Sequence, residues 1–190
     1  MGSEREVAVT SPKGLHRDIL QAREVAGILL EQGAVAINTE QPFVYASGIL
    51  SPIYCDLRLL MGFPQRRERV VELMAAAIEE AYDIASLDVV AGVATAGIPW
   101  AAWIAGCLGK PLAYVREVAK GHGKGQQVEG GVAPGQVAVV VEDLTTTGGS
   151  ALSAVEALRG RGAQVSHCFS VFTYESSQAW DSFQRAGVEL

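Results

Sequence analysis

Short apolar runs alternate with longer amphipathic stretches through the second half of the chain. A short run rich in Val and Ala is typical of a strand covered on both faces, whereas apolar residues at helical spacing predict a helix. The pattern predicts strands over 87–91, 111–115, 136–141 and 164–173. It predicts helices over 98–108, 150–161 and 178–185. This alternation favours an α/β fold, a doubly wound parallel sheet with helices on both faces.

The first third of the chain follows a different pattern. Residues 15–31 have helical spacing and stop before Gly33, a residue suited to a helix C-cap. Residues 34–58 form short apolar clusters broken by Ser-Gly and Ser-Pro turns, which predicts a β-ribbon or flap outside the parallel sheet. Pro64 then opens an amphipathic helix that runs to about Tyr82.

Composition and charge narrow the function classes. The 190 residues are 49% hydrophobic and 19% charged, as in globular proteins, and their net charge is −6. This acidic balance argues against a nucleic-acid binder or a membrane-surface protein. No apolar run approaches the roughly 20 residues that a membrane span needs. Three separated cysteines without a Cys-x-x-Cys pair argue against a zinc site and indicate reduced thiols, so we expect a cytoplasmic protein.

The ends of the chain add little to this picture. Residues 1–13 lack the apolar core of a signal peptide and are typical of a loose polar tail. We therefore expect a single domain over 1–190, preceded by that tail and carrying the flap at about 34–58.

One junction between a strand and a helix is chemically informative. The apolar run that ends at Val141 is followed by Glu142 and Asp143 and then by a loop of Thr, Gly and Ser over 145–150. A small-residue loop that opens a helix presents free backbone N–H groups to a phosphate, helped by the helix dipole. The two carboxylates can accept hydrogen bonds from a vicinal diol, so the stretch predicts a ribose 5-phosphate site. An ordinary turn with capping residues is the alternative; the Walker A and Gly-x-Gly-x-x-Gly motifs are both absent.

Two further loops carry weaker signals. Small residues over 92–99 let a backbone approach an anion closely, although a tight turn explains them equally well. Residues 116–130 place Arg116, Lys120, His122 and Lys124 among glycines, which suits a mobile cationic lid that closes over phosphates. A solvated β-hairpin is the alternative there. All three loops follow predicted strands, where ligands of such sheets bind.

Taken together, these motifs resemble those of the type I phosphoribosyltransferases, which use phosphoribosyl diphosphate (PRPP). The order of the loops resembles the orotate phosphoribosyltransferases in particular. The Phe43 to Gly48 and Ser51 to Asp56 segments are similar to that family's N-terminal hood, and the 116–130 segment is similar to its catalytic loop. The resemblance covers residues 15–185, nearly the whole chain.

The resemblance implies a role for each matching residue. It assigns catalysis to Lys120, His122 and Arg116, the ribose hydroxyls to Glu142 and Asp143, and a place near orotate to Thr146. It implies that PRPP is bound by Arg116, Lys120, His122, Glu142, Asp143, Leu144, Thr145, Thr146, Thr147, Gly148, Gly149 and Ser150. No residue is assigned as a metal ligand, because Mg²⁺ would be held mainly by PRPP and water.

The implied reaction transfers ribose 5-phosphate from PRPP to orotate, giving orotidine 5′-monophosphate and pyrophosphate in pyrimidine biosynthesis. The resemblance also implies a homodimer with shared active sites. Four positions depart from the better-known pattern: Ala46, Ala96, Glu117 and Tyr174. Two alternatives remain at this point, a transferase of the same type for a purine base and a non-catalytic PRPP-sensing regulator of the same fold.

Overall fold

The computed structural model describes residues 12–45, 48, 50–117 and 127–190. These residues fall into two compact units that divide between Leu59 and Leu60. The first unit holds one helix and short strand pairs, and the second holds the central sheet.

The first unit begins with helix α1 (Pro12–Glu31), which stops before Gly33 at a φ of 68°. Strand β1 (Val35–Ile37) pairs antiparallel with β4 (Ile53–Cys55), and β2 (Phe43–Val44) pairs antiparallel with β3 (Leu50–Ser51). The predicted β-ribbon is therefore present. A 3₁₀ helix, η1 (Leu57–Gly62), runs across the division between the units.

The boundary of the predicted tail was wrong by two residues. Pro12 and Lys13 belong to α1, because proline fits the first turn of a helix, where its missing N–H is not needed. Residues 1–11 lie outside the described residues.

The second unit is built on a five-stranded sheet in the order β7-β6-β5-β8-β9. Its strands are β5 (Val89–Val93), β6 (Leu112–Val115), β7 (Val128–Glu129), β8 (Ala138–Thr145) and β9 (Cys168–Thr173). All neighbours are parallel except β7, which runs antiparallel to β6. The parallel core is as predicted, whereas the two-residue edge strand β7 was not predicted.

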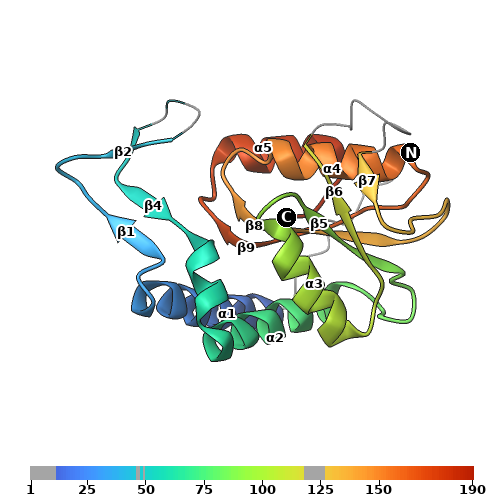
Figure 1. Ribbon diagram of the computed structural model, residues 1–190, viewed down its shortest axis with the longest axis horizontal. Coiled ribbons are helices and arrows are strands. Elements are labelled where there is room, and N and C mark those ends of the chain that lie inside the picture. The colour runs from blue at the N-terminus through green and yellow to red at the C-terminus, as the bar shows by residue number, and fades with distance from the viewer. Residues whose placement is uncertain (1–11, 46–47, 49, 118–126) are drawn as a thin grey trace, which may run out of the picture. The chain divides into compact units, whose positions relative to one another are not determined.

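Helices cover both faces of this sheet, which confirms the predicted fold class. The helices are α2 (Pro64–Ala81), α3 (Gly97–Leu108), α4 (Gly149–Gly160) and α5 (Ser177–Ala186). Figure 1 shows α2 and α3 on one side of the strands and α4 and α5 on the other. No helix within the described ranges has both the length and the apolar character to cross a membrane.

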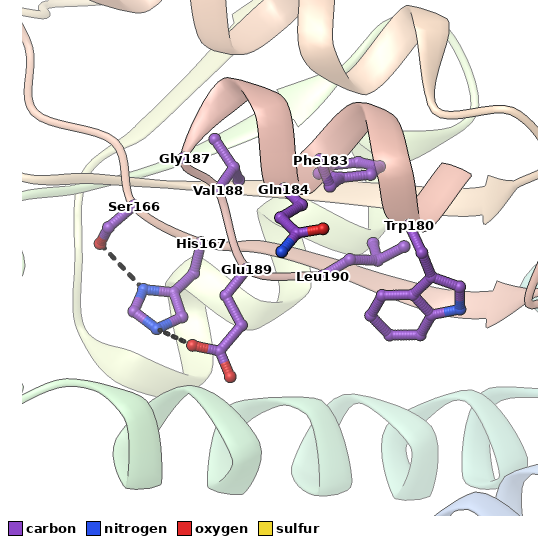
Figure 2. Close-up of a pocket in the computed structure, with 9 residues that line it drawn as sticks. All are labelled: Ser166, His167, Trp180, Phe183, Gln184, Gly187, Val188, Glu189 and Leu190. Carbon is purple, nitrogen blue, oxygen red and sulfur yellow. Dashed lines mark hydrogen bonds and ion pairs between the residues drawn. The ribbon is translucent and has the colours of Figure 1, made fainter. Parts of the chain in front are cut away.

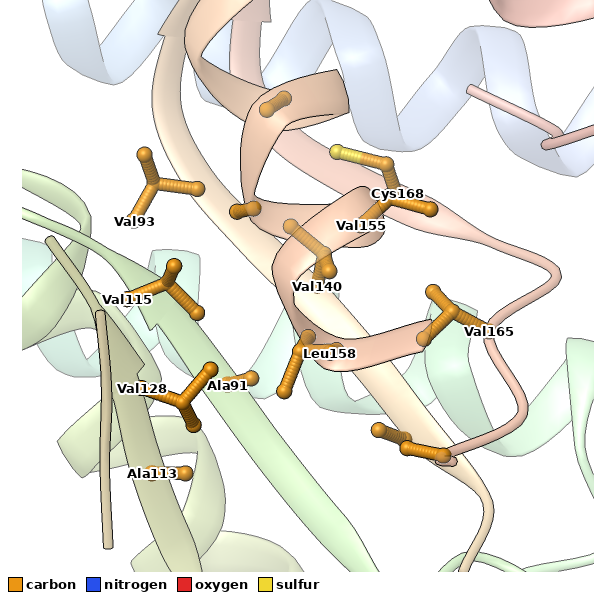
Figure 3. Packing of buried hydrophobic residues seen from close by; sticks show 14 of the residues in the cluster. Ala91, Val93, Ala113, Val115, Val128, Val140, Val155, Leu158, Val165 and Cys168 are labelled. Atoms are coloured by element: carbon orange, nitrogen blue, oxygen red, sulfur yellow. The ribbon is translucent and has the colours of Figure 1, made fainter. Parts of the chain in front are cut away.

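The core on the α4 side explains why this layer forms. Figure 3 shows side chains of β5, β6 and β8, such as Ala91, Val115 and Val140, meeting Val155 and Leu158 of α4. Leu158 is fully buried, and Phe183 of α5 is 1% exposed in the same cluster. Burying side chains of this size stabilises the fold by about 1.5–3 kcal/mol each.

Several strand boundaries differ from the predicted ones. Strand β5 spans Val89–Val93 rather than 87–91, and β6 and β8 begin at Leu112 and Ala138 rather than at 111 and 136. Strand β8 continues to Thr145, beyond the predicted end at 141, because its pairing with β9 continues through Glu142↔Ser170 and Thr145↔Thr173. Strand β9 begins at Cys168 rather than at 164, and only a single bridge joins Gln164 to Val137. Polar residues therefore belong to the end of β8 rather than to a loop.

The strand order places two loops beside each other. Strand β6 lies on one side of β5 and β8 lies on the other, so the chain reverses its direction of winding at β5. In open α/β sheets, ligands bind at the carboxyl ends of the strands where the winding reverses. The fold therefore directs attention to the loops after β5 and β8.

Candidate active site

The loop from β8 to α4 encloses a small cavity of about 140 Å³. Its lining comes from nine residues: Glu142, Leu144, Thr145, Thr146, Thr147, Gly148, Gly149, Ser150 and Ala151. Gly148 has a φ of 82° and directly precedes α4, and no side chain among the described residues caps that helix. The first N–H groups of α4 are thus available to a ligand, and the positive end of its dipole favours an anion. The cavity has the chemistry of a phosphate cradle.

The start of this loop is held by side-chain hydrogen bonds. Thr145 is 2% exposed, and its Oγ1 donates to Ser170 Oγ at 3.0 Å. Ser170 Oγ in turn donates to the carbonyl of Phe172 at 2.8 Å. Farther along, a Cβ atom at Gly148 would lie 2.5 Å from Phe183 Cε2, so only glycine fits this position. The loop is therefore fixed against β9 and α5.

Two carboxyl groups meet at the edge of the cavity. Glu142 is 7% exposed and lines the cavity, whereas Asp143 is partly exposed and does not. The backbone N–H of Asp143 donates to Glu142 Oε1 at 3.1 Å. Burial first, and then the hydrogen bond and the charge of the Asp143 carboxyl, raise the pKa of Glu142 to about 9. Burial therefore favours the neutral form of Glu142, which lessens its repulsion of a phosphate.

The loop from β5 to α3 lies close to Glu142. It contains a cis peptide bond between Ala94 and Thr95, and no described side chain caps α3. A Cβ atom at Gly97 would lie 2.8 Å from the carbonyl oxygen of Val141 and 3.3 Å from Glu142 Oε1. The N-terminus of α3 therefore closely approaches the end of β8. Two uncapped helix N-termini flank Glu142.

Arg116 lies at the carboxyl end of β6, two strands away from β8 in the sheet. Its Nε is 3.4 Å from Glu129 Oε1, and its backbone N–H donates to the carbonyl of Gln127 at 2.9 Å. Arg116 does not line the cavity of the β8–α4 loop. Arg116 is the first residue of the cationic segment 116–130. The other two predicted catalytic residues, Lys120 and His122, lie outside the described residues.

The structure brings most of the predicted PRPP-binding residues together. Every residue from Glu142 to Ser150 except Asp143 lines the cavity, and Ala151 joins them although it was not predicted.

Among the four departures from the family pattern, Ala96 is the residue before α3, and the N–H of Tyr174 donates to the carbonyl of Thr145 at 3.2 Å. Ala46 lies outside the described residues. The close approach of Gly97 to the end of β8 could not be predicted, because the glycine itself is its only sign in the sequence.

A larger cavity of about 540 Å³ lies elsewhere in the second unit. Figure 2 shows its lining, where His167 bonds to Ser166 through Nδ1 at 2.9 Å and pairs with Glu189 through Nε2 at 3.4 Å. Trp180 and Phe183 of α5 contribute aromatic surface. Ser166 and His167 precede β9, so they lie at its amino end, away from the edge where ligands of such sheets bind. We therefore do not assign the reaction to this cavity.

Comparisons with known proteins agree with the geometry. The phosphoribosyl transferase domain family matches residues 64–184. The orotate phosphoribosyltransferase of Listeria innocua is 52% identical over 168 residues, which are 88% of this chain and 79% of that protein. The orotate phosphoribosyltransferase of Coxiella burnetii is 49% identical over the same shares.

Solved structures extend the comparison to the fold. The crystal structure of orotate phosphoribosyltransferase from Aeropyrum pernix is similar with a TM-score of 0.75 and 38% identity, covering 87% of this chain and 90% of that one. Adenine phosphoribosyltransferase from Saccharomyces cerevisiae, at 20% identity and a TM-score of 0.66, shares the fold alone. The chain therefore belongs to the phosphoribosyltransferases, and within them to the orotate phosphoribosyltransferases.

Proposed function

We propose that the chain transfers ribose 5-phosphate from PRPP to orotate, giving orotidine 5′-monophosphate and pyrophosphate. The observation that carries this proposal is the cradle at the N-terminus of α4, which adjoins two carboxyl groups at the carboxyl end of β8. The ribose 5-phosphate half of PRPP requires a phosphate site next to groups that accept hydrogen bonds from its two ribose hydroxyls. The identity to orotate phosphoribosyltransferases, 49–52%, supports orotate as the base.

The cradle would receive the 5-phosphate. Residues Thr146 to Ser150 line the cavity, so their backbone N–H groups are the candidate donors, and the dipole of α4 adds a partial positive charge. Glu142 and Asp143 would bind the ribose 2′ and 3′ hydroxyls. A protonated Glu142 can donate as well as accept a hydrogen bond, so the pair can serve both hydroxyls. Thr146, at the start of the loop, would lie near orotate.

The chemistry follows from the substrate. As the bond from C1 to pyrophosphate stretches, its electron pair moves to the leaving oxygen and the sugar gains positive charge. A ring nitrogen of orotate then bonds to C1 and loses its proton, so no nucleophile of the protein is needed. The protein's task is to stabilise negative charge that grows on the leaving group. The uncapped N-terminus of α3, Arg116, and by family resemblance Lys120 and His122 would share that task.

Magnesium suits this set of donors. Carboxylate oxygens are ligands of the kind that Mg²⁺ prefers, and Mg²⁺ usually keeps several waters. Within the described residues, no cluster of three or more His, Cys, Asp or Glu side chains could hold a metal ion by itself. We expect the ion to be held mainly by PRPP and water, with the Asp143 carboxylate nearby. When bound, the ion would neutralise charge on the pyrophosphate.

The assay that tests the proposal follows the loss of orotate absorbance on addition of PRPP. We expect turnover that needs both PRPP and Mg²⁺, with formation of one pyrophosphate for each orotate consumed. Adenine and xanthine in place of orotate are the controls for base specificity. Turnover of a purine base alone would support the purine alternative. Binding of PRPP without turnover of any base would support a regulator.

We further propose a cytoplasmic homodimer in which the segment after Arg116 completes the neighbouring site. Mixing Lys120→Ala and Asp143→Asn protomers under subunit exchange tests this arrangement. If the segment acts across the dimer, a mixed dimer has one intact site, and activity should rise towards half the wild-type level. If it acts within its own subunit, each site keeps one defect, and demonstrated exchange should restore nothing.

A further inference from the structure

The residue that caps helix α5 also contacts the phosphate loop. Ser176 Oγ accepts a hydrogen bond from the backbone N–H of Ala179 at 3.2 Å, which makes Ser176 the N-cap of α5. The same Oγ donates to the carbonyl of Thr146 at 2.7 Å, thirty positions away in the sequence. Thr146 lines the cavity that we assign to the 5-phosphate.

The direction of the Ser176 proton is fixed by its two partners. A serine hydroxyl has one proton to donate and two lone pairs. The N–H of Ala179 can only donate, so it must take a lone pair of the hydroxyl. The carbonyl of Thr146 can only accept, so the proton points at Thr146. Capping the helix therefore orients the hydroxyl towards the loop.

The bond to Thr146 also fixes the next N–H group. The Thr146–Thr147 peptide is trans, so its C=O and N–H point in opposite directions within one rigid plane. Because the C=O of Thr146 points to Ser176, the N–H of Thr147 points away from Ser176. The preceding peptide is held in the same way, since the N–H of Tyr174 donates to the carbonyl of Thr145 at 3.2 Å. Two successive peptide planes at the start of the cradle thus depend on the segment that leads into α5.

Helix α5 gives these contacts a rigid support. Ala179 is fully buried. Phe183 is 1% exposed and belongs to the core cluster shared with α4. Phe183 also lies directly against Gly148, the residue that precedes α4. Ser176 is therefore anchored to the core rather than to a loose loop.

We propose that Ser176 is a positioning residue for the reaction: its hydroxyl orients the Thr146–Thr147 peptide so that the loop fits the 5-phosphate of PRPP. This inference rests on the proposed function. It assigns a role to a residue outside the cavity lining, which acts through the loop rather than by touching the substrate.

Three substitutions separate this role from helix capping. Ser176→Ala removes the donor and is a poor N-cap. Ser176→Gly also removes the donor, but glycine is nearly as good an N-cap as serine. Ser176→Thr keeps both functions. Ser182→Ala is the matched control, because Ser182 Oγ donates to the carbonyl of Gln178 at 2.8 Å within α5 itself.

The readouts are the KM for PRPP, kcat, and calorimetric affinities for ribose 5-phosphate and pyrophosphate. Ser176→Ala and Ser176→Gly should both raise the KM for PRPP and weaken ribose 5-phosphate about three- to tenfold, the effect of one lost hydrogen bond. Affinity for pyrophosphate and kcat should change less than twofold. Ser176→Thr should restore the affinity for ribose 5-phosphate, and Ser182→Ala should leave it at the wild-type value. Ser176→Ala, which also loses the helix cap, should lower the melting temperature more than Ser176→Gly does.

The inference fails if Ser176→Gly binds ribose 5-phosphate as the wild type does. It also fails if the loss of affinity follows the melting temperature across the variants, because that result indicates a merely structural role. Failure of the proposed function has a different signature: the wild-type protein would then show no PRPP-dependent consumption of orotate, whatever the variants do.

Discussion

Two strand-to-helix loops flank Glu142, and they are built in different ways. Both lead into a helix that no described side chain caps, so both present free N–H groups. The β5–α3 loop owes its position to missing side chains, because at Gly97 even a methyl group would collide with the backbone of Val141. The β8–α4 loop is held by added side chains, since Thr145 bonds to Ser170 and Ser176 bonds to Thr146.

This difference predicts how substitutions should affect each loop. A loop that depends on close backbone packing has no tolerance for added volume, and the cost falls on the fold as well as on the site. A loop held by hydrogen bonds can lose one bond and keep its path, with a cost near 1 kcal/mol. Substitutions in the first loop should therefore have the larger effects on stability, whereas those near the second should mainly change binding.

Gly97→Ala should have the largest effect. The new Cβ would lie 2.8 Å from the carbonyl oxygen of Val141, so α3 must move away from β8. We expect a loss of about 3 kcal/mol in the free energy of unfolding, measured by urea denaturation, together with a large loss of kcat/KM.

Gly106→Ala is the matched control for that substitution. Gly106 lies in the same helix, is exposed, and has no atom within 4 Å of its expected Cβ position. Alanine favours helices over glycine, so this variant should gain about 0.5–1 kcal/mol. Equal destabilisation by both substitutions would contradict the close-packing account of the β5–α3 loop.

Asp143→Asn should act on binding more than on the fold. Asp143 is partly exposed, so the substitution leaves the core unchanged. An amide presents one donor where the ribose diol needs an acceptor, which should lower kcat/KM for PRPP by about 1–3 kcal/mol of transition-state stabilisation. Steady-state kinetics with orotate in excess measure this loss. Wild-type values would remove the ribose role from Asp143.

Glu142→Gln should change how stability depends on pH. The pKa of Glu142 is raised from 4.5 to about 9 in the folded protein, mainly by burial. Between these values the folded state binds more protons than the unfolded state, so the wild-type free energy of unfolding falls as pH rises. Glutamine does not titrate and keeps the shape of the neutral acid. The stability of the variant relative to wild type should therefore rise between pH 5 and pH 8.5.

Urea denaturation at the two pH values measures that gain. Glu156→Gln, at an exposed position of α4, is the control. A stability difference between Glu142→Gln and wild type that stays constant with pH would show that Glu142 is ionised in the folded protein.

The phosphate cradle was largely predictable from the sequence because it is a local feature. A strand, a run of Thr and Gly, and a helix lie next to each other along the chain, and the lining residues from Leu144 to Ser150 are those predicted. The continuation of β8 through Asp143 was not predictable, because it depends on pairing with Ser170 and Phe172 of β9. When only the neighbouring residues are considered, two adjacent carboxylates predict a loop rather than a strand.

Contacts between residues that are far apart in the sequence could not be predicted either. Ser176 has the sequence signature of a helix N-cap, but nothing local indicates that its proton reaches Thr146. Strand β7 has two residues, too few to show a periodic pattern, and it forms only because β6 offers a free edge. The residues that the family resemblance places in catalysis, Lys120 and His122, lie outside the described residues, so their roles stay predictions.

Glu175→Gly should have the smallest effect, a slight gain in stability. Glu175 links β9 to the N-cap of α5 and has a φ of 51°, a left-handed conformation that costs a residue with a Cβ atom about 1–2 kcal/mol. Glycine adopts this conformation freely but loses more entropy on folding, so the net gain should be about 0.5–1 kcal/mol in the free energy of unfolding. The same exchange at Glu156, inside α4, should destabilise by a similar amount.

The N–H of residue 175 keeps its bond to Thr173 Oγ1, so the contacts from Tyr174 and Ser176 to the phosphate loop should remain. A more stable variant with an unchanged KM for PRPP would show that these hydrogen bonds, and not the strained turn itself, position the loop; a raised KM would show that the turn's conformation is part of the site.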